Sequence, residues 1–226
     1  MKLYALNVRW LDEDHTFSML LNFVSEDRRK KTLAFRYAKD RALSLGAGLL
    51  LNLAIAREAP GMRMPPEIRM GEYGRPFLAE NGAPSYSLSH SGEYAVCAIG
   101  PETVGVDIEK IGTADEAVAR RCFLTSELQR VMRDGTVNAE RFYSLWTLKE
   151  SYIKFIGTGL SLDPLRFEIL DTHPMRVMRE GVEMPCHFKL YEELAGYKLA
   201  LCMESDHFPD RAHVIGEEEL RDGIRC

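Results

Sequence analysis

The sequence has no long apolar run, no excess of positive charge and no continuous apolar segment among its first residues, and each absence argues against a class of protein. The formal net charge of the 226 residues is −5, which argues against bulk nucleic-acid binding, because such domains usually carry a basic surface. No stretch approaches the roughly 20 apolar residues of a membrane-spanning helix. The first ten residues, MKLYALNVRW, lack the continuous apolar segment of a signal peptide. We therefore expect a soluble, cytoplasmic protein that binds neither membranes nor nucleic acid.

The five cysteines show no regular spacing, which excludes a familiar zinc-binding or disulfide pattern. They occur without a CxxC pair and without a histidine at metal-ligand spacing. An odd number without a pattern is typical of buried or free thiols in a reducing compartment. The five are Cys97, Cys122, Cys186, Cys202 and Cys226.

Hydrophobic periodicity predicts an α+β protein whose two halves repeat loosely. The first half is expected to contain a strand at 2–10, helices over 25–58 with a break near 38–40, irregular chain with short strands up to residue 84, and strands over 85–109, of which 94–109 form a hairpin. The second half is expected to contain helices near 114–122, 125–133 and 138–156 and strands near 165–170, 184–191 and 196–203.

A faint internal echo supports this repeat. The stretch YKLALCME at 197–204 resembles YAVCAIG at 94–100 in its alternation and its central cysteine, a weak indication of related copies. No flexible linker separates the halves, so we expect them to pack as one body. The charged tail EEELRDGIRC is expected at the periphery.

The segment VGVDIEKI at 104–111 places two carboxylates on one face of a predicted strand. Asp107 and Glu109 are two residues apart, and alternate side chains of a strand point the same way. Like charges held this close repel. Most such pairs simply lie on a solvent-facing strand edge. The alternative is a magnesium site, because Mg²⁺ prefers carboxylate oxygens and its charge would remove the repulsion.

The predicted helix FYSLWTLKESYIKFIGTGL, residues 142–160, carries three charged side chains on an apolar segment. Its aromatic residues are expected in the core, and its final glycines are typical of a helix C-cap. Glu150 and Lys154 are four residues apart and could form a surface ion pair. If the helix packs beside the 104–109 strand, however, Glu150 becomes a third oxygen ligand. Lys149 and Lys154 would then attract a phosphate-bearing ligand.

Two further clusters suit an anionic ligand. Ser89, His90 and Ser91 precede a glycine. A Ser-His catalytic pair is disfavoured, because chain neighbours on a strand face apart and no GxSxG motif is present. A set of phosphate donors and a plain turn both remain open. Residues 28–31 read RRKK, and Arg75 lies within GRPFL. They form either a solvated surface or one wall of an anion-binding cleft.

Four of these segments, in this order, resemble the motifs of the Sfp-type 4′-phosphopantetheinyl transferases. They are GRPFL at 74–78, SLSHSG at 87–92, GVDIE at 105–109 and FYSLWTLKESYIKFIGTGL at 142–160. The resemblance implies a monomer with two similar α+β halves related by a pseudo-twofold axis, residues 1–103 and 104–226, and coenzyme A in the cleft between them. It also implies Mg²⁺-dependent transfer of the phosphopantetheine arm of coenzyme A to a serine of an apo acyl or peptidyl carrier protein, with release of 3′,5′-ADP.

The same resemblance implies roles for individual residues. The matched magnesium ligands are Asp107, Glu109 and Glu150, and the matched catalytic residues are Glu150 as general base, Lys154 and Asp107. The matched coenzyme A contacts are Arg28, Lys31, Arg75, Ser89, His90, Lys149 and Lys154. Arg75 replaces the commoner Lys and keeps its charge, whereas Ser87 replaces the commoner Asn. Glu127 matches a supporting acid, and residues 111–125, including Phe123 and Leu124, match the region that contacts the carrier protein.

Two other functions suit the same residues. A different Mg²⁺-dependent enzyme acting on a nucleotide diphosphate would share the acids and lysines but would not release 3′,5′-ADP. A non-catalytic module that binds coenzyme A or a carrier protein would not need all three acids. The intact set of Asp107, Glu109 and Glu150 argues against the non-catalytic alternative.

Overall fold

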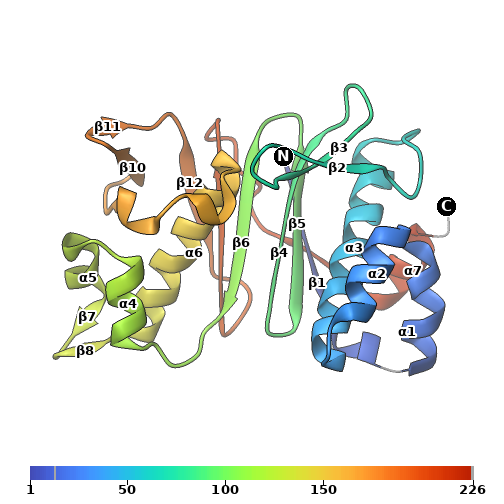
Figure 1. Ribbon diagram of the computed structural model, residues 1–226, viewed down its shortest axis with the longest axis horizontal. Coiled ribbons are helices and arrows are strands. Elements are labelled where there is room, and N and C mark those ends of the chain that lie inside the picture. Colours follow the sequence, from blue (N-terminus) through green and yellow to red (C-terminus); the bar gives the residue numbers. More distant parts are fainter. Residues whose placement is uncertain (13, 225–226) are drawn as a thin grey trace.

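Two β-sheets, each packed against one long helix, organise residues 1–12 and 14–224, the part of the chain that this computed structural model describes (Figure 1). The first half contains β1 (Lys2–Asn7), the 3₁₀ turns η1 (Arg9–Asp12) and η2 (Leu21–Phe23), α1 (Asp14–Leu20), α2 (Glu26–Ala34), α3 (Ala38–Glu58), β2 (Ile68–Met70), β3 (Pro76–Leu78), β4 (Ser85–Ser91) and β5 (Tyr94–Gly100).

The second half begins at the strand that carries the two carboxylates. Its elements are β6 (Val104–Lys110), α4 (Glu116–Cys122), α5 (Thr125–Val131), β7 (Met132–Arg133), β8 (Thr136–Val137), α6 (Ala139–Ile156), η3 (Gly159–Ser161), η4 (Pro164–Arg166), β9 (Phe167–Leu170), β10 (Arg176–Arg179), β11 (Val182–Glu183), β12 (His187–Tyr191) and β13 (Tyr197–Met203). The chain ends with β14 (His213–Ile215) and α7 (Glu217–Gly223).

The two main sheets repeat one topology. Their strand orders are β14-β1-β5-β4 and β12-β13-β6. With β14 left aside, each sheet places the last strand of its half between the first and the next to last, as β1-β5-β4 and β6-β13-β12. A long helix, α3 or α6, lies in the connection after each first strand. The two stretches with similar sequence, on β5 and β13, therefore occupy equivalent central positions. The predicted α+β fold of two similar halves is confirmed.

The predicted hairpin over 94–109 is wrong, because its two strands belong to different sheets. β5 pairs antiparallel with β1 and β4, whereas β6 pairs antiparallel with β13, from Val104 opposite Met203 to Lys110 opposite Tyr197. The short turn after β5 carries the chain from one sheet to the next. Alternation in a sequence indicates a strand but not its partner, so the order of neighbours was open.

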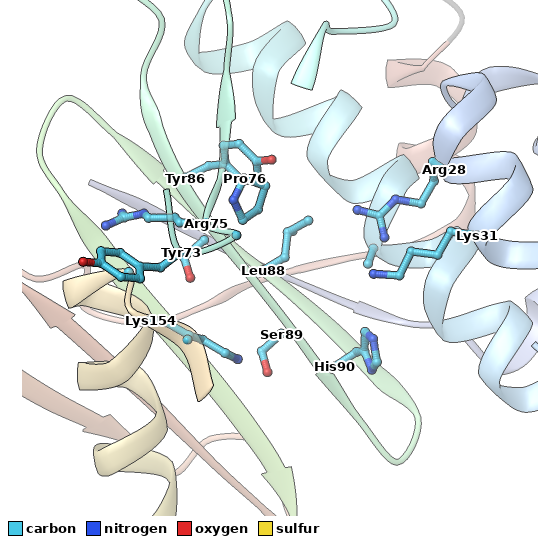
Figure 2. Close-up of a pocket in the computed structure, with 15 residues that line it drawn as sticks. Arg28, Lys31, Tyr73, Arg75, Pro76, Tyr86, Leu88, Ser89, His90 and Lys154 are labelled. Carbon is cyan, nitrogen blue, oxygen red and sulfur yellow. The ribbon is translucent and has the colours of Figure 1, made fainter. Parts of the chain in front are cut away.

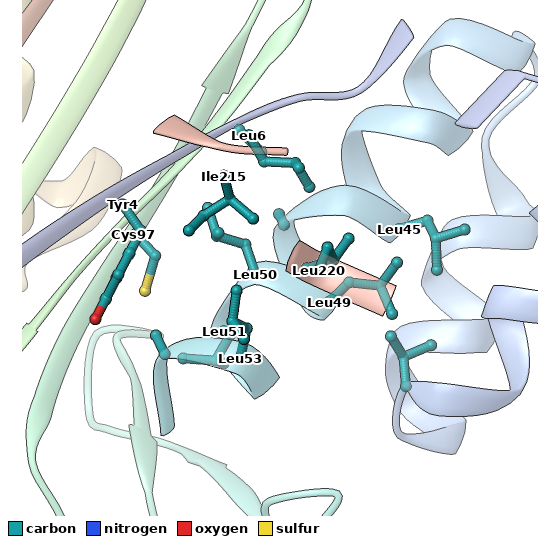
Figure 3. Packing of buried hydrophobic residues seen from close by; sticks show 14 of the residues in the cluster. Tyr4, Leu6, Leu45, Leu49, Leu50, Leu51, Leu53, Cys97, Ile215 and Leu220 are labelled. Carbon is teal, nitrogen blue, oxygen red and sulfur yellow. The ribbon is translucent and has the colours of Figure 1, made fainter. Parts of the chain in front are cut away.

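The core of the first half is built around α3. Every residue from Ala42 to Ile55 is buried, as expected for a helix enclosed on all sides. Figure 3 shows Leu45, Leu49 and Leu50 of this helix in the core. The preceding helix α2 starts at the predicted cap, since the Ser25 hydroxyl accepts a hydrogen bond from the backbone N–H of Arg28. The break between the two helices lies at 35–37, slightly before the predicted position.

The end of the chain returns to the first half and is not peripheral. β14 pairs parallel with β1, with Leu6 opposite Ile215, and Leu220 of α7 is fully buried in the core of the first half (Figure 3). The predicted second half, 104–226, is therefore wrong for its last segment. The sequence signal for this contact is Leu220, an apolar residue among acidic neighbours.

The prediction of buried, free cysteines is confirmed for the residues that the structure describes. Cys97, Cys122, Cys186 and Cys202 are free and buried, as expected, whereas Cys226 lies outside the described residues. Among the described residues, no helix combines the length and the apolar character that crossing a membrane requires.

A glycine sets the distance between β6 and α6, the two elements that carry the acidic residues. A Cβ at Gly105 would lie 2.0 Å from the carbonyl oxygen of Ser151 and 2.4 Å from the backbone nitrogen of Phe155. We expect Gly105→Ala to push the two elements apart and to lower the free energy of unfolding by about 1–3 kcal/mol. Urea denaturation measures this change.

A matched control is available at the start of α7. A Cβ at Gly216 would meet no atom within 4 Å, so Gly216→Ala should have a small effect. Equal stability of the two variants would show that β6 and α6 do not require this close approach.

Candidate active site

A pocket of about 450 Å³ lies at the junction of the two halves and is strongly basic. The basic residues that line it are Arg28 and Lys31 of α2, Arg75 before β3, His90 of β4 and Lys154 of α6. None of the described residues around it is acidic. Figure 2 shows these side chains around one open space. A concave surface of one charge concentrates oppositely charged ligands, so the pocket suits a polyanion.

The alternation of β4 connects this pocket to the acidic residues. Residues 86, 88 and 90 face the helices, while the serines between them face β6. Ser87 accepts a hydrogen bond of 3.0 Å from a backbone N–H of β6. Ser89 donates to Asp107 and Ser91 donates to Glu109, each at 2.8 Å. The row of serines therefore fixes the two carboxylates against the edge strand of the first sheet.

Asp107 is the most buried of the three predicted metal ligands. It is 3% exposed, and its Oδ1 accepts hydrogen bonds from Ser89 at 2.8 Å and from Lys154 Nζ at 2.7 Å. Its Oδ2 is buried and has no hydrogen-bond partner among the described residues. Leaving a buried charged oxygen unpaired costs free energy. This oxygen is therefore open to a cation.

Glu109 and Glu150 lie near Asp107, and their partial burial disfavours their charged forms. Burial, followed by the charge of Asp107, raises the pKa of Glu109 above its ordinary value. Burial and the charge of Asp107 also raise the pKa of Glu150 to about 7. The charge of Asp107 thus disfavours the charged forms of both glutamates.

These three acids fit a divalent cation chemically, although they do not surround a single point. Within 1–12 and 14–224, no three His, Cys, Asp or Glu side chains are placed as ligands of one ion. Lys154 instead occupies one oxygen of Asp107, and Ser91 and Trp146 occupy the two oxygens of Glu109. A set of carboxylates with an unpaired buried oxygen is nevertheless the donor type that Mg²⁺ prefers.

Trp146 is a site residue that the sequence interpretation assigned to the core. It precedes Glu150 by one helical turn, as Lys154 follows it by one, so the three share a face of α6. Its indole Nε1 donates a hydrogen bond of 3.3 Å to Glu109. The four-residue spacing from Glu150 was the signal that could have identified it.

Lys149 does not line the pocket, so its predicted contact with coenzyme A is wrong. Its side chain is fully buried and forms an ion pair of 2.6 Å with Glu127, which is also fully buried. Its Nζ also donates to the carbonyl oxygens of Pro164 and Phe167, at 2.7 and 2.9 Å. All three of its donors are used. Lys149 and Glu127 therefore anchor α6 inside the second half.

Arg75 connects the two halves at the edge of the pocket. Its guanidinium donates to the carbonyl oxygens of Phe155, at 2.7 Å, and Val104, at 3.2 Å. In the predicted carrier-contacting region, Phe123 is only 3% exposed and packs against Phe142. Phe123 is therefore a core residue and not a contact for a partner.

The basic side chains on α2 and β4 lie in surroundings that disfavour their charged forms. Burial is the main cause that lowers the pKa of Arg28, and partial desolvation followed by the charge of Lys154 lowers the pKa of His90. Lys31 and Arg28 add smaller repulsive effects on His90. An anion placed among these groups would reverse each penalty, since it would favour their charged forms.

The raised pKa of Glu150 predicts a specific pH dependence of stability. Its folded pKa of about 7 lies above the ordinary value of 4.5, so the folded protein holds more protons between these pH values than the unfolded chain does. The free energy of unfolding should therefore fall as the pH rises from about 4.5 to 7. Without divalent cations, Glu150→Gln should remove this decline and stabilise the protein by roughly 1–2 kcal/mol at pH 8.

Denaturation at pH 5 and pH 8 measures the effect. Glu218→Gln, on the exposed surface of α7, should leave the pH dependence as it is. A decline of equal size in Glu150→Gln and in the unchanged protein would contradict the interpretation.

Comparison with known proteins identifies relatives over nearly the whole chain. A family model described as the 4′-phosphopantetheinyl transferase superfamily matches residues 103–202, and a model described as 4′-phosphopantetheinyl transferase, N-terminal, matches residues 8–102. The two ranges meet just before β6, where the chain passes from one sheet to the other.

Individual relatives agree with these matches. The chain is 30% identical to 4′-phosphopantetheinyl transferase Sfp of Bacillus subtilis (strain 168) and 31% identical to the transferase ffp of Bacillus subtilis, in both cases over 97% of this chain and 100% of the relative. It is 28% identical to L-aminoadipate-semialdehyde dehydrogenase-phosphopantetheinyl transferase of Mus musculus, over 74% of this chain and 59% of that protein. Holo-[acyl-carrier-protein] synthase of Thermotoga maritima aligns with 45% of this chain and 61% of its own, at 22% identity and a TM-score of 0.34.

Proposed function

The chain belongs to the 4′-phosphopantetheinyl transferase superfamily, and we propose that it moves the phosphopantetheine arm of coenzyme A to a serine of an apo acyl or peptidyl carrier protein. The serine oxygen forms a bond to the phosphorus that bears the arm. The diphosphate bond breaks, and 3′,5′-ADP leaves with its electron pair. The observation that carries the proposal is a basic pocket that opens beside three mutually repelling carboxylates.

The residues of the site would have different roles that follow from their positions. Arg28, Lys31 and His90 would bind the phosphates of coenzyme A, because they line the pocket and gain from a nearby anion. Lys154, between the pocket and Asp107, would neutralise charge that develops on the leaving group. Glu150 would take the proton of the attacking serine, directly or through water, since a pKa near 7 suits a general base at neutral pH.

Asp107, Glu109 and Glu150 are the residues that would hold Mg²⁺. The ion, when bound, would supply positive charge to the diphosphate and would polarise the phosphorus under attack. Ser89, Ser91 and Trp146 would keep the first two carboxylates in place through their hydrogen bonds. We further propose that the protein acts as a monomer in the cytoplasm.

The proposal is tested by mass spectrometry. Purified protein, coenzyme A and Mg²⁺ are incubated with a panel of apo acyl and peptidyl carrier proteins. We expect a carrier to gain the mass of one phosphopantetheine group while 3′,5′-ADP appears in equal amount. Binding of coenzyme A without any mass gain across the panel would favour a non-catalytic module. Turnover of a nucleotide diphosphate without 3′,5′-ADP would favour a different Mg²⁺-dependent enzyme.

A further inference from the structure

The turn between β4 and β5 is held by a tyrosine of the second half. The backbone N–H of Glu93 donates a hydrogen bond of 2.9 Å to the hydroxyl of Tyr197, the first residue of β13. Tyr197 is 6% exposed, and its ring packs edge-on against the ring of Tyr94, with 5.0 Å between the centroids. A backbone donor that is shielded from water needs a partner. Here the partner is a side chain 104 residues further along the chain, so it ties the two halves together.

The glycine before Glu93 makes room for this contact. Gly92 has a φ of +61°, and a Cβ there would lie 2.4 Å from the hydroxyl oxygen of Tyr197 and 2.7 Å from Cδ of Lys110. The carboxylate of Glu93 also pairs with Arg9 at 2.9 Å and lies 3.7 Å from Lys110 Nζ. Both basic side chains are at least half exposed, so these ion pairs add little. The hydroxyl of Tyr197 is therefore the buried polar part of the contact.

Two side chains of the candidate site directly precede this turn. Ser91 donates a hydrogen bond of 2.8 Å to Glu109 and accepts one of 3.0 Å from the backbone N–H of Lys110. His90 points to the opposite face of β4 and lines the pocket. β4 and β6 lie side by side but belong to different sheets (Figure 1). Side-chain contacts must therefore fix how the end of β4 lies against Glu109.

We propose that Tyr197 is a positioning residue of the candidate active site, whose hydroxyl holds the β4–β5 turn so that Ser91 stays hydrogen-bonded to Glu109. This inference rests on the proposed function, in which Glu109 is one of the carboxylates that would hold Mg²⁺. Tyr197 is not among the described residues that line the pocket. It would therefore act through the turn and through Ser91.

Amide hydrogen exchange in the metal-free protein tests the contact itself. Tyr197→Phe removes the acceptor of the Glu93 N–H, and the loss of one hydrogen bond should speed the exchange of this amide by about 10-fold. The N–H of Lys110, which donates to Ser91, should also exchange faster, because the position of Ser91 depends on the turn. Unchanged exchange at Lys110 would overturn the proposal, since the effect of the hydroxyl would then end at the turn.

The functional measurement is the Mg²⁺ concentration that gives half of the maximal transfer rate. Loss of a group that orients a metal ligand costs about 10- to 100-fold in metal affinity or activity, so Ser91→Ala should raise this concentration by that factor. Tyr197→Phe should raise it by about 3- to 10-fold, a part of the same loss, with little change in the KM for coenzyme A. Ser91→Thr, which keeps the hydroxyl, should restore most of the loss. In the double variant, Tyr197→Phe should add nothing to Ser91→Ala, whereas effects that multiply would overturn the proposal.

A matched control removes another buried tyrosine hydroxyl of the same sheet. Tyr191 of β12 is 3% exposed and donates a hydrogen bond of 2.9 Å to the carbonyl oxygen of Pro209. Tyr191→Phe should lower the melting temperature about as much as Tyr197→Phe does. It should leave the exchange of the Glu93 and Lys110 amides and the Mg²⁺ dependence unchanged. An equal change of the Mg²⁺ dependence in both variants would show that Tyr197 only stabilises the fold.

Failure of this inference can be distinguished from failure of the proposed function. If the unchanged protein transfers no phosphopantetheine to any carrier, both proposals fall. If it modifies a carrier, while Tyr197→Phe alters neither the exchange at Lys110 nor the Mg²⁺ dependence, only the role of Tyr197 is wrong.

Discussion

Asp107→Asn is expected to lower kcat for phosphopantetheine transfer by about 100- to 1,000-fold, or roughly 3–4 kcal/mol, while the protein stays folded. Asp107 is the residue on which the site converges. It is 3% exposed, and its Oδ1 accepts hydrogen bonds from Ser89 and Lys154, while its Oδ2 has no partner among the described residues. Asparagine keeps the volume of the side chain and removes the charge that a divalent cation requires. Initial rates at saturating coenzyme A and carrier protein measure the effect.

A binding measurement separates loss of chemistry from loss of the pocket. In the presence of a chelator, coenzyme A should bind Asp107→Asn at least as well as the unchanged protein, because the substitution removes a negative charge beside Lys154. Asp206→Asn, at an exposed position, is the matched control and should leave kcat unchanged. If Asp107→Asn retains full turnover, the proposed arrangement of the acids is wrong.

Glu127→Ala is expected to destabilise the protein by about 3–5 kcal/mol, because it leaves the ammonium group of Lys149 buried without its counter-charge. Both side chains are fully buried and 2.6 Å apart. Glu127 also accepts hydrogen bonds from the backbone N–H groups of Leu124, at 2.9 Å, and Ile169, at 2.8 Å. Its removal therefore exposes a charge and two backbone donors to an apolar core. Chemical denaturation measures the loss.

An exposed ion pair provides the control for this prediction. Arg176 and Glu183 are 3.0 Å apart with about half of each side chain exposed, so Glu183→Ala should change the stability by less than about 1 kcal/mol. The double variant Glu127→Gln with Lys149→Met should recover much of the loss, since no buried charge then lacks a partner. If Glu127→Ala is as mild as Glu183→Ala, the buried pair does not anchor α6.

The acidic part of the candidate site was proposed from the sequence because the relevant spacings are local. The two-residue spacing of Asp107 and Glu109 on a strand and the four-residue spacing of Glu150 and Lys154 on a helix determine which side chains share a face. The same rule could have corrected the assignment of Lys149. Successive residues of a helix are about 100° apart, so a helix that turns Glu150 toward β6 must turn Lys149 elsewhere.

Other features depend on which distant segments meet, and periodicity carries no such information. The partner of β6 is β13, about ninety residues further along the chain, so the hairpin with β5 was a choice between strands of equal character. The contact of Trp146 with Glu109 requires α6 to cross β6 closely, which Gly105 permits. The burial of Leu220 depends on its contacts with the hydrophobic core of the first half. Contacts between segments that are distant in the sequence determine all three features.

The return of the last segment to the first sheet has a consequence for how the protein is made. Residues 1–103 leave the ribosome first, but β14 and Leu220, which complete their sheet and core, are translated more than a hundred residues later. The first half therefore cannot reach its final packing until β14 and α7 have been synthesised. A fragment that ends near residue 103 would leave the surface around Leu6 and Leu53 uncovered. The two halves look separable in topology, yet the first half can complete its packing only after the second half has been synthesised.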